Sequence, residues 1–301
     1  METIIKGVHN FIEIIDELSY SYHTYGFFDV PVHPKFVFRG VGKKSYPLLP
    51  NILRNHVTNI HGMEIPNRKY TAWATEKSIL KNFIAEASGI VNSIPYSDLY
   101  RWAEYAQHYG APTRFMDWTG NPLVALFFAC CAKGEENPAV WVLNISNYQI
   151  FAEQNNMETI DKDTINTMTS SEIINQMLDN KHILNYPIIY QPHYVDTRMS
   201  AQSSYFMVWG NKCEALDEMI PEENYMQLSN ADSNRGRTFR KMQEQGIILK
   251  IEIYNDRKQE ILRTLDIMGI NDKTLFPGLD GIGKYIERKY RFDYNEAVER
   301  L

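Results

Sequence analysis

The sequence predicts an α+β fold, a single mixed domain with a central sheet flanked by helices. In several segments apolar residues recur at steps of three and four, which is typical of helices with one buried face. Other segments are short, apolar and rich in β-branched residues, as buried strands are. Neither an internal repeat nor a Pro- or Ser-rich linker divides the 301 residues, so one domain is favoured over two.

The N-terminal part predicts a helix followed by a strand. Residues 4–18 carry apolar side chains at helical steps, which indicates a helix packed on one face. We therefore expect residues 1–29 to form an N-terminal helical segment ahead of the main domain. The segment 36–40, with the sequence FVFRG, is typical of a short strand that stops at a glycine. Arg39 is expected at the end of this strand.

Three helices are expected in the middle of the chain. Apolar residues keep helical steps over residues 73–91. Ser97 or Asp98 can cap a second helix, which ends where Gly110 supplies backbone freedom. A third helix over residues 121–131 begins with an Asn-Pro pair, a suitable N-cap and first helical residue. Because its remaining residues are almost all apolar, this helix should be buried on every side.

The second half of the chain combines strands with polar segments. Strands are expected at residues 139–143, 187–190, 204–209 and 246–253. We interpret residues 150–185, which are polar with a weak helical pattern, as an insertion or lid, and residues 210–240 as a variable segment. A helix, a turn-rich stretch and a final helix close a domain that should span residues 30–290, leaving residues 291–301 as a tail.

The composition narrows the class of protein. A hydrophobic share of 44% and an aromatic share of 13% favour a packed chain over a disordered one. The longest apolar run, from Leu123 to Ala132, is too short to span a membrane, and the acidic N-terminus is unlike a secretory signal. The three cysteines show no metal-ligand spacing, and the net charge of −6 argues against broad capture of duplex nucleic acid. We expect a cytoplasmic protein without membrane contact.

Arg39 is the first candidate for a functional residue. An arginine that leaves a buried strand can direct a planar fork of donors at a phosphate or a carboxylate. Gly40, which follows it, would let a ligand approach the backbone. The alternative is a structural arginine paired with a buried carboxylate such as Asp117. The sequence leaves both interpretations open.

The segment from Gln107 to Thr119 is the second candidate, because it is dense in side chains that form hydrogen bonds. It lies between an amphipathic helix and a wholly apolar one, so part of it must be buried. If its polar groups satisfy one another, it is a structural element. If one face stays open, it is a ligand pocket that contains His108, Arg114 and Asp117. His108 on its own is more typical of a satisfied core histidine than of a catalytic base.

The third candidate is the stretch from Arg198 to Phe206, which leads into a strand. Gln202 within it could hold an amide or a ribose hydroxyl, although Gln and Ser at such a position often only cap a turn. Common catalytic signatures, such as a Walker phosphate loop or a Gly-x-Ser-x-Gly elbow, do not occur in the sequence.

These three places resemble the FRG-domain family, which is named after the tripeptide Phe38-Arg39-Gly40. The resemblance extends over about residues 30–290. The matching positions are Phe38-Arg39-Gly40, Leu48, Pro50, Arg54, Glu76, Phe83, residues 107–129, Arg198, Gln202, Phe206 and the closing run from Gly269 to Gly281. Family members commonly have glycine at the position of Ser203 and aspartate at that of Gly278.

The resemblance implies a fold and an activity. A strand that ends in Arg-Gly is similar to the first motif of the ADP-ribosyltransferase fold, which has a mostly antiparallel central sheet flanked by helices. FRG proteins are prokaryotic and phage-associated, which implies a toxin or phage-defence effector that uses NAD as co-substrate. The acceptor would be nucleic acid, either RNA or DNA, or protein, and an antitoxin or chaperone would be a possible partner.

The same resemblance assigns roles around NAD. Arg39 would orient the pyrophosphate or ribose of NAD, and Gly40 would let the nicotinamide amide pair with the backbone. Tyr109 or Trp118 would stack on a ring. Gln202 would position a ribose or the acceptor.

A carboxylate is needed to stabilise the oxocarbenium-like transition state, and Asp117 and Glu76 are the candidates. His108 and Arg114 would complete the cofactor site. Two alternatives remain open. The first is a non-catalytic module that senses a nucleotide or binds a partner. The second is a metal-dependent nuclease with His108, Asp117 and Glu76 as ligands, although their spacing fits known metal sites poorly.

Overall fold

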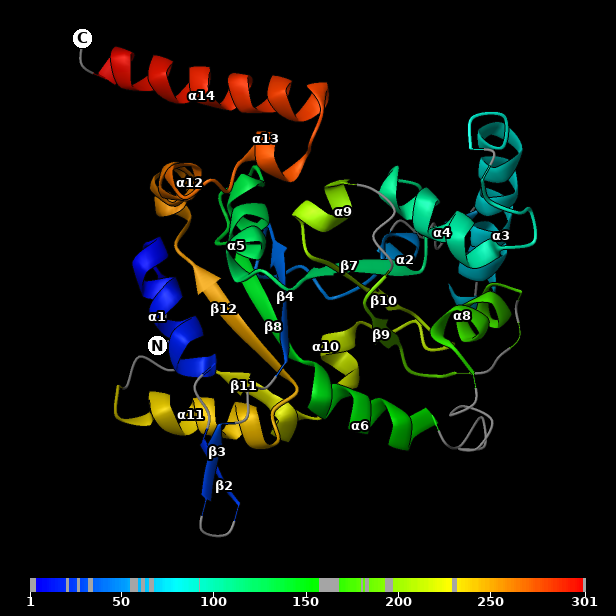
Figure 1. The fold of residues 1–301 in the computed structure, drawn as a ribbon, viewed down its shortest axis with the longest axis horizontal. Coiled ribbons are helices and arrows are strands. Elements are labelled where there is room, and N and C mark those ends of the chain that lie inside the picture. Colours follow the sequence, from blue (N-terminus) through cyan, green and yellow to red (C-terminus); the bar gives the residue numbers. More distant parts are fainter. Residues whose placement is uncertain are drawn as a thin grey trace.

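The computed structural model describes residues 4–19, 22–25, 28–31, 35–54, 59–60, 63–64, 68–91, 93–156, 168–179, 181, 184–192, 197–228 and 232–299. Within these ranges the chain forms a central sheet with helices on both faces, as Figure 1 shows. The predicted α+β class is therefore confirmed.

The sheet has eight strands in the order β1-β12-β8-β4-β7-β10-β9, and β11 also pairs with β12. These strands are β1 (Ile4–Ile5), β4 (Phe36–Val41), β7 (Phe115–Thr119), β8 (Ala139–Asn144), β9 (Ile188–Tyr190), β10 (Ser204–Val208), β11 (Tyr225–Gln227) and β12 (Ile248–Ile253). Only β1 and β11 run parallel to their neighbour β12, and the other pairings are antiparallel. The expected mostly antiparallel sheet is thus confirmed.

Two short hairpins lie apart from this sheet. They are β2 (Tyr22–Tyr25) with β3 (Phe28–Pro31), and β5 (Asn59–Ile60) with β6 (Met63–Glu64). The helices are α1 (Val8–Ser19), α2 (Asn51–Arg54), α3 (Arg68–Ala87), α4 (Leu99–His108), α5 (Pro122–Cys131), α6 (Ile145–Asn156), α8 (Ser170–Leu178), α9 (Thr197–Ala201), α10 (Leu216–Met219), α11 (Asp232–Glu244), α12 (Lys258–Ile267), α13 (Asp272–Leu275) and α14 (Leu279–Glu299). None of the described helices is both long enough and apolar enough to cross a membrane.

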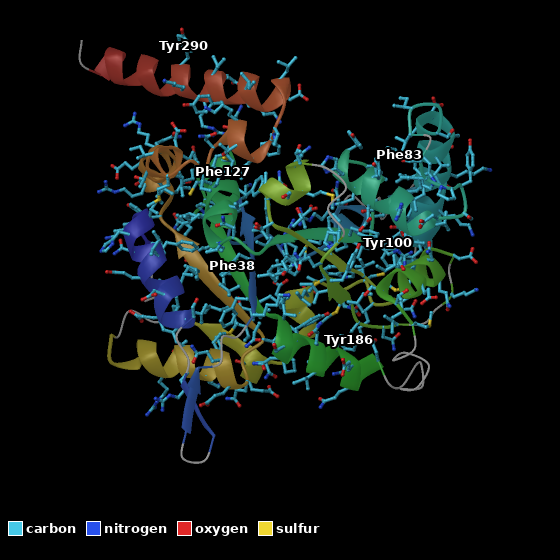
Figure 2. All side chains as sticks on the ribbon, in the orientation of Figure 1. Phe38, Phe83, Tyr100, Phe127, Tyr186 and Tyr290 are labelled. Atoms are coloured by element: carbon cyan, nitrogen blue, oxygen red, sulfur yellow. The ribbon has the colours of Figure 1, made fainter. Side chains whose placement is uncertain are left out.

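The alternation of side chains along β4 and β8 divides the core into two layers, because successive residues of a strand face opposite sides of the sheet. On one side Phe38 packs with Val140 and with helices α1, α5 and α12. Phe38 and Phe127 of α5 both lie in this layer (Figure 2). On the other side Val37 and Trp141 pack with residues of α2, α3, α6 and α10. A further cluster joins α4 and α8 to β7 and β10.

Helix α5 is mostly buried, as its apolar sequence predicts, although Leu123, Phe128 and Cys131 are only half-buried. Asn121 caps it, since the side-chain oxygen of Asn121 accepts a hydrogen bond of 3.0 Å from the backbone nitrogen of Leu123. The helix lies directly on β4 (Figure 1). The closest approach is between Gly40 of β4 and the stretch of α5 from Ala125 to Ala129.

The segments that flank the expected domain are part of the same body where the structure describes them. Within residues 1–29, β1 adds to the edge of the sheet and α1 packs into the core. Residues 150–185 include the end of α6 and all of α8, and Ile174 of α8 is fully buried. The backbone of α14 continues through residues 291–299. The hairpin of β2 with β3 also begins within residues 1–29. Residues 1–3, 20–21 and 26–27 of the expected N-terminal segment, and residues 157–167, 180 and 182–183 of the insertion, lie outside the described residues.

Candidate functional site

The sheet opens between β4 and β7. Phe38 and Thr119 are the one residue pair in register between these two strands, whereas β7 and β10 pair through five residues and β4 and β8 through six. Beyond that pair the strands diverge, and a terminal nitrogen of Arg39 donates a hydrogen bond to the backbone oxygen of Asp117. Arg39 therefore fills the start of a gap in the sheet.

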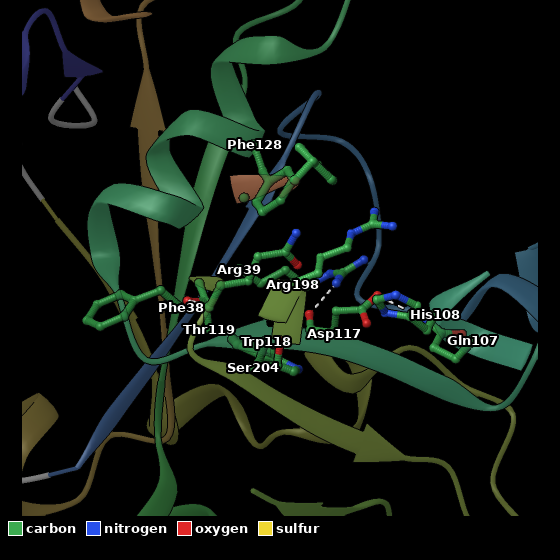
Figure 3. Close-up of a pocket in the computed structure, with 13 residues that line it drawn as sticks. Phe38, Arg39, Gln107, His108, Asp117, Trp118, Thr119, Phe128, Arg198 and Ser204 are labelled. Atoms are coloured by element: carbon green, nitrogen blue, oxygen red, sulfur yellow. Dashed lines mark hydrogen bonds between the residues drawn. The ribbon is translucent and has the colours of Figure 1, made fainter. Parts of the chain in front are cut away.

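A cavity of about 350 Å³ occupies this gap. Its walls are Phe38, Arg39, Gly40, Gln107, His108, Asp117, Trp118, Thr119, Phe128, Arg198, Gln202, Ser204 and Phe276. Figure 3 shows these side chains around the common space. All three places that the sequence singled out thus contribute to a single pocket, because β4, β7 and the turn after α9 meet where the sheet opens.

Arg39 supplies positive charge to the pocket. Desolvation lowers the pKa of Arg39 to about 10, while Asp117 raises this pKa and Arg54 lowers it further. At neutral pH the guanidinium group is still protonated. Its buried Nε atom has no hydrogen-bond partner among the described residues. A buried N–H group without a partner at the wall of a cavity can donate a hydrogen bond to an acceptor atom of a bound ligand.

The carboxylate of Asp117 is held in position by a short chain of side-chain hydrogen bonds. The hydroxyl of Thr113 donates to the amide oxygen of Gln107 over 2.6 Å, and the amide nitrogen of Gln107 donates to Asp117 over 2.8 Å. Thr113 fixes which end of the Gln107 amide faces Asp117. The side chain of Asp117 is otherwise exposed, so one face of the carboxylate is open to the cavity.

Gln202 joins the pocket to the C-terminal part of the chain. Its amide nitrogen donates to the backbone oxygen of Leu275 over 3.0 Å, and its backbone oxygen accepts from Thr119 over 2.6 Å. The next residue, Ser203, has a φ of 48°, in the left-handed region that favours glycine. This backbone conformation explains why a glycine would suit position 203.

Among the lining residues that the sequence-based site did not include are Phe128, Arg198 and Phe276, which contact one another. The rings of Phe128 and Phe276 meet edge to face with centroids 6.0 Å apart. The guanidinium carbon of Arg198 lies 4.5 Å from the centroid of Phe276. Sequence reasoning had one signal for them, since Phe128, Arg198 and Phe276 all fall on positions of the family pattern.

Glu76 and Arg114 do not line the cavity. They form a buried ion pair in which Glu76 accepts from the backbone nitrogen of Arg114 over 2.7 Å and from its Nε over 2.6 Å. The side chains are 1% and 4% exposed, and Trp73 stacks on the guanidinium group. This geometry makes the pair a fixed connection between α3 and β7.

The remaining expected site residues divide between wall and surface. His108 and Trp118 line the cavity, and Trp118 is buried. Tyr109 is 68% exposed, lies outside the cavity and contacts the edge of His108 with ring centroids 5.0 Å apart. The three residues considered as metal ligands are not gathered, because Glu76 is held by Arg114. Among the described residues no cluster of three His, Cys, Asp or Glu could hold a metal ion.

Gly40 has a packing role in addition to its place in the cavity wall. A Cβ atom at this position would lie 2.6 Å from the backbone nitrogen of Ala129, and closer still to the backbone oxygen of Ala125. The absent side chain therefore makes room for α5. The apolar helix can approach the strand only because position 40 is glycine.

Comparison with protein families matches the FRG domain to residues 34–138. The matched range includes β4, α4, β7 and α5, and with them Arg39, Gln107, Asp117 and Phe128. Arg198 and Phe276 complete the cavity from outside it. No curated protein and no solved structure matches the chain.

Proposed function

This chain carries an FRG domain over residues 34–138, and we propose that its pocket binds NAD and transfers ADP-ribose to an acceptor. One observation supports the proposal above the others: Arg39 and Asp117 bring a cation and a carboxylate to the same opening in the sheet. An arginine fork binds phosphate oxygens. A carboxylate stabilises positive charge that develops on a ribose ring.

The proposed reaction begins when the bond between C1′ of the ribose and the nicotinamide nitrogen breaks. The bonding electrons go to the nicotinamide ring, which leaves as a neutral molecule, and C1′ acquires oxocarbenium character. Asp117 stabilises this charge. A nucleophilic oxygen or nitrogen of the acceptor then attacks C1′, and its proton passes to the solvent or to a base. Arg39 holds the pyrophosphate in place during both steps.

The first experiment incubates the purified protein with NAD and cell lysate. Products heavier by one ADP-ribose unit, together with released nicotinamide, are expected. Arg39→Ala should abolish both signals, whereas Glu260→Gln, which alters a surface carboxylate on α12, should leave them unchanged. The melting temperature of Arg39→Ala separates the two roles of the arginine. If Arg39→Ala is unfolded, Arg39 is a structural residue, and the loss of activity in this variant is no evidence that Arg39 binds NAD.

We further propose that the protein acts in the cytoplasm as a toxin or phage-defence effector, with an antitoxin or chaperone as partner and nucleic acid or protein as acceptor. Growth arrest on expression, relieved by Arg39→Ala, is the expected result. Unimpaired growth during wild-type expression, in cells without such a partner, would count against a toxin.

A second candidate is a non-catalytic module that senses a nucleotide or binds a partner. The observation that favours it is that Asp117 carries the sole carboxylate among the described residues that line the cavity, and Gln107 already occupies one of its oxygens. Calorimetry separates the two candidates. Binding of NAD without release of nicotinamide, with every acceptor supplied, would favour the sensing module.

A further inference from the structure

Arg198 is a second cation of the same pocket, and it enters from α9 rather than from the sheet. Figure 3 shows Arg198 and Arg39 reaching into one space with their guanidinium groups on the side of Asp117 and His108. Two arginines therefore face one carboxylate in the wall of the cavity. The excess of positive charge favours an anionic ligand.

The guanidinium group of Arg198 stacks with its flat face on the ring of Phe276. Its guanidinium carbon lies 4.5 Å from the centroid of Phe276, at a distance typical of a cation-π contact. Such stacking occupies the face of the group and leaves the N–H donors in its plane available. Within the described residues no hydrogen bond or ion pair holds these donors.

Phe276 is itself fixed from several sides. Phe128 meets its ring edge to face, and Lys284 of α14 lies 5.1 Å from the ring centroid. The backbone at Leu275 is fixed by Gln202. Gly281 passes so close to the backbone of Phe276 that a Cβ at position 281 would collide with it. Arg198 is thus presented on a rigid support before a ligand arrives.

We infer that Arg198 and Arg39 form a two-point anion clamp, so that the pocket selects a ligand with a diphosphate, such as a nucleoside diphosphate or the ADP-ribose portion of a dinucleotide. Arg39 receives one phosphate at the opening of the sheet and Arg198 receives the other from α9. Each guanidinium presents a fork of donors that matches two phosphate oxygens. The inference rests on the proposed function, because it names the part of the co-substrate that these two residues hold.

Calorimetric titration of the full chain with adenosine, AMP, ADP and ADP-ribose at one salt concentration tests the clamp. The wild type should bind ADP at least about tenfold more tightly than AMP, since a charge-assisted hydrogen bond contributes a factor of this order. Arg198→Gln should reduce that ratio to about 1 while it preserves the affinity for AMP. Phe276→Leu should weaken ADP binding less than Arg198→Gln does.

Arg101→Gln is the matched control, because Arg101 is an exposed arginine of α4 that does not line the cavity. It should bind ADP as the wild type does, and melting curves should show all variants folded. Equal wild-type affinities for AMP and ADP, or an undiminished ratio in Arg198→Gln, would overturn the clamp.

The calorimetric test of the clamp does not depend on whether the protein turns over NAD. If the ADP preference depends on Arg198 but NAD is not consumed, the clamp stands and the proposed reaction fails. If NAD is consumed and Arg198→Gln leaves the KM for NAD unchanged, the reaction stands and the clamp fails.

Discussion

Replacing Gly40 by alanine would place a methyl group against the backbone of α5. The new Cβ would lie 2.6 Å from the nitrogen of Ala129, whereas real Cβ contacts are essentially never shorter than 3.0 Å. Because the obstacle is helix backbone and not a flexible side chain, α5 would have to withdraw by about 0.4 Å to clear the nitrogen of Ala129, and by more to clear the oxygen of Ala125. Overpacking of this kind costs about 1–3 kcal/mol, and a backbone obstacle places Gly40→Ala at or above the upper end of that range.

Urea denaturation followed by circular dichroism measures this cost as a lower transition midpoint. Gly283→Ala in α14 is the matched control, because nothing lies within 4 Å of a Cβ at Gly283. In a helix that substitution should stabilise by about 0.5–1 kcal/mol. If Gly40→Ala is as stable as the wild type, α5 does not lie against β4 as described and the packing role of Gly40 is wrong.

Three further predictions concern stability. Burial raises the pKa of Glu104 to about 7, so the proton it binds favours the folded state fully below pH 4.5, and this contribution is lost as pH rises through 7. Glutamine at position 104 has no such titration. The free energy of unfolding of Glu104→Gln, measured by urea titration, should therefore rise relative to that of the wild type by up to about 3 kcal/mol from pH 5 to pH 8. The same difference between variant and wild type at both pH values would refute this. Glu76→Ala leaves Arg114 buried without its partner and should cost about 3–5 kcal/mol, whereas the exposed Lys77→Ala control should cost less than about 0.5 kcal/mol. Ser203→Gly relieves a left-handed backbone and should raise the melting midpoint by an amount equivalent to about 0.5–1 kcal/mol, and a lower midpoint would contradict the strain.

Local patterns predicted β4, α4, α5 and β10 near the site but not β7, which forms within the polar segment from Gln107 to Thr119. The strand that carries Arg39 forms where the sequence predicts it, although it runs one residue past Gly40 to Val41, and α5 begins with an Asn-Pro pair and has no polar face. Short-range physics therefore determines most of both elements. The density of polar groups from Gln107 to Thr119 also indicated a partly open, partly buried segment. Hydrogen bonds among Thr113, Gln107 and Asp117 account for the part that is satisfied internally.

Long-range partners could not be predicted in the same way. Periodicity indicates that Glu76 lies on a helix and Arg114 in a buried segment, but not that the two meet across 38 residues. Phe276 is held at the pocket by contacts with residues distant in the sequence, among them Phe128 and, through the backbone of Leu275, Gln202. Neither the stacking of Arg198 on Phe276 nor the contact of α5 with Gly40 leaves a periodic signal. Such contacts depend on how the sheet order brings distant segments together.

We propose that Asp117 stabilises a cation formed from NAD in the pocket where Arg39 would bind the phosphates of NAD. The most direct test is the rate of nicotinamide release by the purified protein at saturating NAD, compared between the wild type and Asp117→Asn. The substitution keeps the size of the side chain and its contact with Gln107 but removes the charge. We predict a loss of about 100-fold or more in kcat with little change in the affinity for NAD. An Asp117→Asn variant that releases nicotinamide at the wild-type rate would contradict the claim.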